Sequence, residues 1–172
     1  MIDVWAEKIA VAIKKANEEE TASVPVMTFA LTVLLNLIVP SLCSLLIGLL
    51  TGALPETAAS IAAFVAIRTV SGGYHFRSPI ACMIAMVAIT AAPPHIPLSG
   101  FWTTLLTAAA AVCMACLAPS HMRGYNTMPE RVYPLLKAAS VALVCGNFVL
   151  GSSTAALLFF VQGISLLRLK EV

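Results

Sequence analysis

The chain has 172 residues, which is enough for one compact domain. Hydrophobic residues make up 60% of it and charged residues only 10%, whereas a soluble domain carries about 25% charged residues. The mean hydropathy is +0.95, and a soluble fold of this size could not bury that much apolar surface. The net charge of +2 is spread over separate short segments, which excludes a nucleic-acid binder. The composition therefore predicts an all-α integral membrane protein.

The first twenty residues predict an amphipathic helix. Charged residues interrupt the segment repeatedly, and it ends in the glutamate run 18–20, which does not fit a signal peptide. Apolar residues recur at steps of three and four, the spacing of one helical face: Ile2, Trp5, Ile9, Ile13 and Ala16. We expect residues 1–20 to lie on the membrane surface, with Trp5 at the level of the lipid headgroups. The alternative is a helix that packs on the rest of the protein.

Six membrane helices follow from the apolar windows. A helix that crosses the hydrocarbon core needs about 20 residues. Four windows of the chain contain no Asp, Glu, Lys or Arg: residues 21–55, 57–67, 78–122 and 138–167. Clusters of Gly, Pro and Ser divide these windows further. The predicted helices are 26–50, 56–69, 79–92, 100–118, 133–150 and 154–168. Pro40 predicts a kink or a split in the first of them. All of them belong to a single membrane-embedded domain, residues 1–172.

The positive charges predict the orientation of these helices. With six spans and a cytoplasmic N-terminus, all ten Lys and Arg residues fall on one side of the membrane, and the opposite connections contain only Glu56. Cytoplasmic connections of membrane proteins carry an excess of Lys and Arg. We therefore expect both termini and the polar segment 68–78 on the cytoplasmic side. A hairpin at Pro40 would move three N-terminal lysines to the other side.

The polar segment 68–78 stands between two apolar helices and ends in a helix start. Ser78 followed by Pro79 predicts a hydroxyl N-cap and a proline at the first helical position. Cys82 then lies in the first turn or just past it. The N-terminus of a helix favours a thiolate, and Arg77 adds a positive charge. Burial raises the pKa of a thiol, however, so the chemistry needs a base nearby.

His75 is the candidate base. An imidazole within hydrogen-bond reach of a thiol can take its proton and form a thiolate–imidazolium pair. The separation of seven positions between His75 and Cys82 does not prove contact. Gly72 and Gly73 allow tight turns and close approach of another backbone, which favours contact. From the residues alone, a catalytic dyad and a chance pairing of one His with one Cys both stay open.

The segment resembles the signature of the AgrB family, membrane cysteine endopeptidases of Gram-positive quorum sensing that process an AgrD-type propeptide. The residues that carry the resemblance are Arg68, Gly72, Gly73, His75, Ser78 and Cys82. A looser similarity includes Ala118-Pro119 together with Asn126 and Pro129 in the basic loop that follows. The N-terminal helix and the order of the spans also fit, so the resemblance extends over nearly the whole chain.

The resemblance implies roles for these residues in a bacterial cytoplasmic membrane. Cys82 would attack the propeptide carbonyl at its C-terminal processing site, and His75 would activate Cys82 and protonate the leaving amine. An internal nucleophile of the propeptide would then close a thiolactone or lactone. Substrate binding or loop ordering would fall to Arg68, Gly72, Gly73, Arg77 and Ser78. Glu130 and Asn126 are weak candidates for a third catalytic group, and no cofactor or metal ion is expected.

Other chemistry-bearing residues have simpler interpretations. Cys113 and Cys116 form a C-x-x-C inside an apolar span, where packing is more common than a metal or redox site. Cys43, Cys145, His95 and His121 are expected to be ordinary span or loop residues. Gly48 and Gly52 predict close packing within the chain rather than the seam of a homodimer, although a homodimer stays open.

Two other functions compete with the peptidase. A small transporter would place ionisable groups within its spans, and the charge-free windows hold none. A non-catalytic membrane scaffold would recruit partners through residues 1–20. The expected partners of the peptidase are the propeptide and the lipid bilayer.

Overall fold

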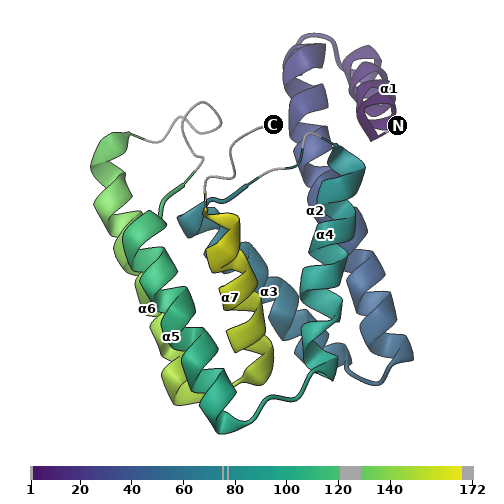
Figure 1. Cartoon of the computed structure of the whole chain (residues 1–172). Coiled ribbons are helices and arrows are strands. Elements are labelled where there is room, and N and C mark those ends of the chain that lie inside the picture. Colours follow the sequence, from purple (N-terminus) through teal and green to yellow (C-terminus); the bar gives the residue numbers. More distant parts are fainter. Residues whose placement is uncertain (1, 75, 77, 121–128, 168–172) are drawn as a thin grey trace.

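The computed structural model describes residues 2–74, 76, 78–120 and 129–167 (Figure 1). This described part is all-helical and contains seven α-helices and two short 3₁₀ turns, η1 (Pro93–His95) and η2 (Glu130–Val132). The α-helices are α1 (Ile2–Ala16), α2 (Val24–Leu50), α3 (Leu54–Ser71), α4 (Pro79–Ala91), α5 (Gly100–Leu117), α6 (Tyr133–Leu150) and α7 (Ser153–Ser165).

Helices α2 to α7 form a bundle in which consecutive helices that share a short connection run in opposite directions (Figure 1). α5 packs against α6 and α7, α2 packs against α4, and α3 lies between these two groups. One end of the bundle holds residues 72–74, 76 and 78, residues 118–120 and the end of α7, and we call it the site end. The far end holds the connections 51–53, 92–99 and 151–152. The six helices thus bring three separate stretches of chain together at one end.

The seven helices occupy the segments for which the sequence predicts helices. α3 is longer than the predicted 56–69, because Pro55 fits in the first turn, where its missing N–H costs nothing. α2 continues through Pro40 as one helix, so the predicted alternative of a split there is wrong. α4 has 13 residues and covers about 20 Å, which is short of a hydrocarbon core of ~30 Å.

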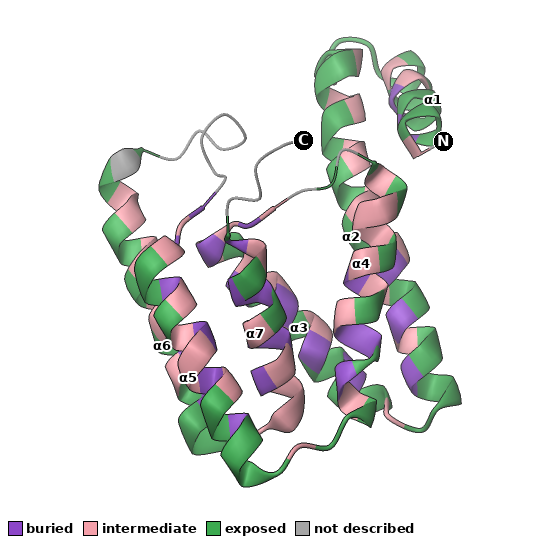
Figure 2. Ribbon diagram, viewed as in Figure 1, coloured by how far each residue is buried: buried purple, intermediate pink, exposed green. Residues whose placement is uncertain are grey.

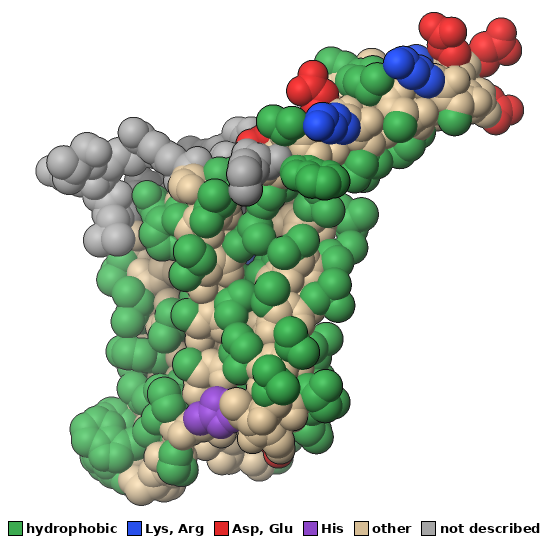
Figure 3. Space-filling model, turned by 90° about the vertical axis from the view of Figure 1, so that its right-hand side faces the viewer, with side chains coloured by type: hydrophobic (Ala, Val, Ile, Leu, Met, Phe, Trp, Pro, Cys, Tyr) green, Lys and Arg blue, Asp and Glu red, His purple; other side chains and the backbone are tan. Residues whose placement is uncertain are grey.

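In the part of the chain that the structure describes, three helices are long and apolar enough to cross a membrane: α2, α5 and α6. The segments Pro79–His95 and Ser153–Ser165 are shorter apolar helices, and α3 carries Glu56 in its first turn and Arg68 in its last. Hydrophobic side chains cover the flank of the bundle, while the charged side chains in view gather on α1 (Figure 3). This distribution is that of a helical membrane protein, because lipid replaces water around the flank.

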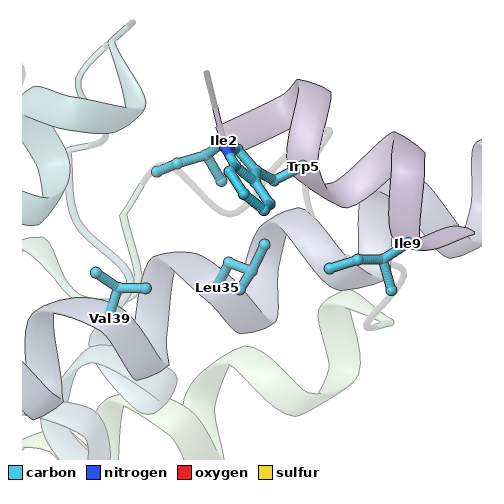
Figure 4. A pocket seen from close by; sticks show the side chains of 5 residues that line it. All are labelled: Ile2, Trp5, Ile9, Leu35 and Val39. Carbon is cyan, nitrogen blue, oxygen red and sulfur yellow. The ribbon is translucent and has the colours of Figure 1, made fainter.

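The N-terminal helix α1 packs against α2, which agrees with the packing alternative. Ala6 and Ala10 are fully buried in this contact, whereas Trp5 is 66% exposed. The apolar face that the sequence predicts for α1 is therefore not the face that is buried against α2. Part of it lines a groove of about 220 Å³ between the two helices, formed by Ile2, Trp5, Ile9, Leu35 and Val39 (Figure 4). The small alanines make the close contact, because they let the two backbones approach.

Buried positions gather on the inward faces of the helices (Figure 2). Several of the buried side chains are polar and bond across from one helix to another. Asn147 of α6 donates to the Thr107 hydroxyl of α5 at 2.9 Å and to the Ser152 carbonyl at 3.1 Å. The Ser44 hydroxyl of α2 lies 2.8 Å from the Thr90 hydroxyl of α4. Since an unpaired polar group is costly in an apolar interior, these pairs fix which helix faces contact each other.

The predicted close packing at Gly48 occurs within the chain, against α3. A Cβ placed on Gly48 would lie 2.6 Å from the Thr57 hydroxyl oxygen and 2.8 Å from its Cβ. Thr57 is β-branched and buried on a helix, so it has little freedom to move. We expect Gly48→Ala to lower the thermal unfolding temperature in detergent by several degrees. Gly146→Ala is the matched control, because its Cβ meets nothing within 4 Å. Equal unfolding temperatures for the two variants would contradict this packing.

Candidate active site

The segment that follows α3 is held by two glycines with positive φ. Gly72 ends α3 with φ +71°, and Gly73 follows with φ +124°, a conformation that residues with a side chain rarely adopt. The Gly73 N–H donates to the Ser120 carbonyl at 3.0 Å, and the Ser120 N–H donates to the Ser71 carbonyl at 3.0 Å. These bonds form a short parallel bridge between residues 72 and 120. The two glycines thus let the segment after α3 pair with the segment after α5.

The end of α7 supports the same segment. The Tyr74 N–H donates to the Ser165 carbonyl at 2.9 Å, and the Ser120 hydroxyl donates to the Leu166 carbonyl at 3.2 Å. The last carbonyls of a helix have no partner within the helix. Here residues 74 and 120 supply the donors, so the end of α7 joins the two segments into one unit.

Arg68 reaches from the last turn of α3 over this unit. Its Nη2 donates to the Tyr74 carbonyl at 2.5 Å, and the side chain is half-buried. A Cβ on Gly73 would lie 2.8 Å from Arg68 Nη1 and 2.8 Å from the Ser165 hydroxyl. Only glycine therefore leaves room for the guanidinium to cross the backbone at position 73. The arrangement places a cation at the site end of an otherwise apolar bundle.

Cys82 lies one turn into α4, as the sequence predicts. Ser78 is the N-cap and accepts from the Ala81 N–H at 3.5 Å, and Pro79 opens the helix. Cys82 is half-buried, and its thiol donates to the Phe76 carbonyl at 3.6 Å. The Arg68 guanidinium lies close enough to Cys82 to interact with it electrostatically.

The structure brings Arg68, Gly72, Gly73, Ser78 and Cys82 together at the site end. His75 and Arg77 lie outside the described residues, as do His121 and Asn126. Glu130 begins the turn η2, and its side chain is also outside the described part. The Cys82 thiol contacts the carbonyl of Phe76, the residue that follows His75 in the chain.

The remaining cysteines and His95 lie elsewhere. Cys113 packs against Gly163 of α7, since a Cβ added to Gly163 would lie 3.0 Å from the Cys113 Cβ. His95 is at the far end, with its Nε2 3.2 Å from the Thr51 hydroxyl. Within the described ranges, no three side chains of His, Cys, Asp and Glu gather as metal ligands would. All described cysteines are free thiols.

Sequence reasoning missed the residues of α7, and the serine that follows α5, that hold the segment. Gln162 is almost completely buried and donates to the Ser71 hydroxyl at 3.0 Å and to the Gly72 carbonyl at 2.7 Å. Ser120 and Ser165 complete the contacts. A signal was present, because Gln162 is an amide within the charge-free window 138–167, and an amide in an apolar span needs a partner.

Comparisons with known proteins give a family. A family model described as Accessory gene regulator B (AgrB) matches residues 6–166. An AgrB-like protein of Halalkalibacterium halodurans is 30% identical over 106 residues, which are 62% of this chain and 54% of that protein, so the match spans about half of the relative's length. No solved structure matches the chain. The family match includes the site segment and all of α2 to α7. The chain belongs to the AgrB family, a family of peptidases.

Proposed function

We propose that this protein is a membrane cysteine endopeptidase that cleaves the C-terminal tail from an AgrD-type propeptide and cyclises the remainder. Residues 1–172 act as a single membrane-embedded peptidase domain. The observation that carries the proposal is the position of Cys82: one turn into α4, near the guanidinium of Arg68, in a chain that belongs to a peptidase family. This placement supports the role of nucleophile.

The first stage is acyl transfer to Cys82. His75 takes the thiol proton, and the thiolate sulfur attacks the carbonyl carbon at the processing site. N–H groups at the start of α4 stabilise the oxyanion that forms. The C–N bond then breaks, and the imidazolium of His75 gives its proton to the leaving amine. The products are a thioester between the propeptide and Cys82, and the free C-terminal tail.

The second stage closes the ring. A thiol or hydroxyl inside the propeptide attacks the thioester carbonyl, the bond to Cys82 breaks, and the Cys82 thiol is restored. Because the internal nucleophile is part of the same chain as the thioester, its effective concentration exceeds that of any free nucleophile. The product is a thiolactone if the nucleophile is Cys and a lactone if it is Ser.

The other site residues order the loop around the dyad. Arg68 donates to the Tyr74 carbonyl, which supports a loop-ordering role, and its charge also suits the acidic tail of a propeptide. Gly72 and Gly73 give the segment the backbone conformation that this contact requires. Ser78 caps α4 and so positions Cys82. Arg77, the residue before Ser78 in the chain, adds a positive charge to this segment of the sequence.

The proposed location is the bacterial cytoplasmic membrane, with six spans, both termini cytoplasmic and α1 at the interface. The charges support this orientation. Described lysines and arginines occur on α1 and at the site end, where Arg68, Arg131 and Lys137 are found, whereas Glu56 lies at the far end. By the positive-inside tendency, the site end faces the cytoplasm.

The alkylation rate of Cys82 tests the dyad without any propeptide. In protein that keeps Cys82 and has Ala at the other four cysteines, we expect iodoacetamide at neutral pH to modify Cys82 at least about 10-fold faster than in the His75→Ala variant, because the thiolate is the reactive form. The measurement is intact mass against time in detergent. Equal rates with and without the imidazole would contradict the proposed dyad.

A further inference from the structure

Gln162 of α7 contacts the site segment from a helix distant in sequence. Its side chain is 1% exposed, and its Nε2 donates to the Ser71 hydroxyl at 3.0 Å and to the Gly72 carbonyl at 2.7 Å. A Cβ on Gly73 would lie 3.0 Å from the same nitrogen. The amide group therefore donates to two consecutive residues, 71 and 72, shortly before His75 in the chain.

The orientation of the Gln162 amide is fixed by its partners. The Gly72 carbonyl can only accept, so the NH₂ group and not the oxygen must face it. The Ser71 hydroxyl donates to the Ile67 carbonyl at 2.7 Å, so toward Gln162 it acts as an acceptor. Both N–H bonds of the amide are thus used on residues 71 and 72. An apolar side chain here would leave the part-buried Gly72 carbonyl without this donor, which is costly where little water reaches it.

The contacts continue from Gln162 to the nucleophile. Residues 71 and 72 are held by Gln162, residue 74 by Ser165 and Arg68, and the carbonyl of residue 76 accepts from the Cys82 thiol. His75 stands between the last two of these contacts in the chain. A shift of the backbone at residues 71–73 would therefore change where residues 75 and 76 lie relative to Cys82.

We propose that Gln162 is a positioning residue for the proposed Cys82–His75 dyad: its amide holds the Ser71 hydroxyl and the Gly72 carbonyl and thereby orders the segment that leads to His75 and to the Phe76 carbonyl, which accepts from the Cys82 thiol. This inference rests on the proposed function. Gln162 does not touch the reacting atoms and acts through the segment that it holds. Misplacement of a catalytic group by about 1 Å can cost about 100-fold in rate, so the effect of losing the amide should be large.

Asn147 provides a matched control inside the same bundle. It is also 1% exposed, and its Nδ2 also makes two donor bonds, to the Thr107 hydroxyl and the Ser152 carbonyl. These partners lie on α5 and at the start of α7, toward the far end. Replacing Gln162 with an apolar side chain of similar size removes two hydrogen bonds. The same change at Asn147 removes three, because the Asn147 Oδ1 also accepts from the Ser152 N–H at 3.1 Å. Of these two amide side chains, Gln162 contacts the site segment and Asn147 does not.

The experiment compares Gln162→Met, Gln162→Asn and Asn147→Leu with the parent. The measurements are thermal unfolding, propeptide cleavage, and the pH dependence of Cys82 alkylation in the single-cysteine protein. We expect Gln162→Met and Asn147→Leu to lower the unfolding temperature by similar amounts. Gln162→Met should reduce cleavage about 100-fold and move the alkylation profile to higher pH. Asn147→Leu should keep the parental profile and cleave within a few-fold of the parent.

Gln162→Asn keeps an amide but is one methylene too short to reach Gly72, so it should show the same displaced profile even if Gln162→Met does not fold. A parental profile in Gln162→Asn, or an equal displacement in Asn147→Leu, would overturn the inference. His75→Ala separates this result from the proposed function. If His75→Ala displaces the profile and the Gln162 variants do not, only the positioning role fails; if His75→Ala itself leaves the profile unchanged, the dyad fails.

Discussion

Replacing Cys82 with Ala is expected to reduce propeptide cleavage by at least about 10³-fold, because no acyl-enzyme can form without the thiolate. The measurement is the initial rate of cleavage in proteoliposomes, followed by mass spectrometry of the released C-terminal tail. Insertion and folding should be preserved, since Cys82 is only half-buried and its thiol makes one weak bond, to the Phe76 carbonyl.

His75→Ala should cause a loss of similar size. Without the imidazole, the thiol keeps its proton at neutral pH and the leaving amine has no acid to protonate it. Residues that act as a unit are not additive, so the double variant Cys82→Ala/His75→Ala should be no worse than Cys82→Ala alone. A double variant with a much larger loss would show that the two residues act independently.

Four control substitutions test whether the loss is specific. Each of these variants should cleave the propeptide at a rate within a few-fold of the parent: Cys113→Ala, Cys116→Ala, His95→Ala and His121→Ala. Cys113 packs against Gly163, and His95 contacts Thr51 at the far end, which keeps both away from Cys82. If any of the four were as inactive as Cys82→Ala, the assignment of the dyad would be wrong.

Much of the fold follows from local sequence signals. Turn formers at Gly52, Pro93 and Gly151 lie within the charge-free windows and break their apolar runs, and helices end close to each of them. Ser78 and Pro79 predict the start of α4, and the structure has its N-cap and first helical residue at these positions. These signals are local, because capping and proline effects act within one turn of helix.

The packing of α1 depends on more than its own periodicity. The apolar stripe through Trp5 and Ile9 predicts a surface for the membrane, yet the fully buried residues are Ala6 and Ala10, on a neighbouring face. Hydrophobicity ranks Trp and Ile above Ala, but close contact between two helices selects small side chains. A single sequence does not say which of the two effects decides the packing.

The candidate site was predictable only in part, for a similar reason. Arg68, Gly72, Gly73, Ser78 and Cys82 are close in sequence, and the structure brings them together. Gln162 and Ser120 are distant from them in the chain, and only the packing of α7 and α5 on α3 brings them to the same segment. Gln162 was visible as a polar residue in an apolar window, but its partner was not.

The central claim is that Cys82 forms a thioester which the propeptide itself resolves. A thioester keeps much of the free energy of an activated acyl group and can pass the peptide to a second nucleophile. Water competes for it, and a half-buried cysteine at the end of an apolar bundle limits access of water. The internal nucleophile of the bound propeptide has the advantage of proximity. Removing that nucleophile should therefore leave the peptide attached to the enzyme.

The most direct measurement is the intact mass of the enzyme after incubation with a propeptide whose internal Cys or Ser is replaced with Ala. We predict one cut and an adduct with the mass of the enzyme plus the truncated peptide, which neutral hydroxylamine releases. The Cys82→Ser variant should not form this thioester. Rapid turnover to free linear peptide, with no trapped adduct on Cys82, would show a hydrolase and contradict the cyclase mechanism.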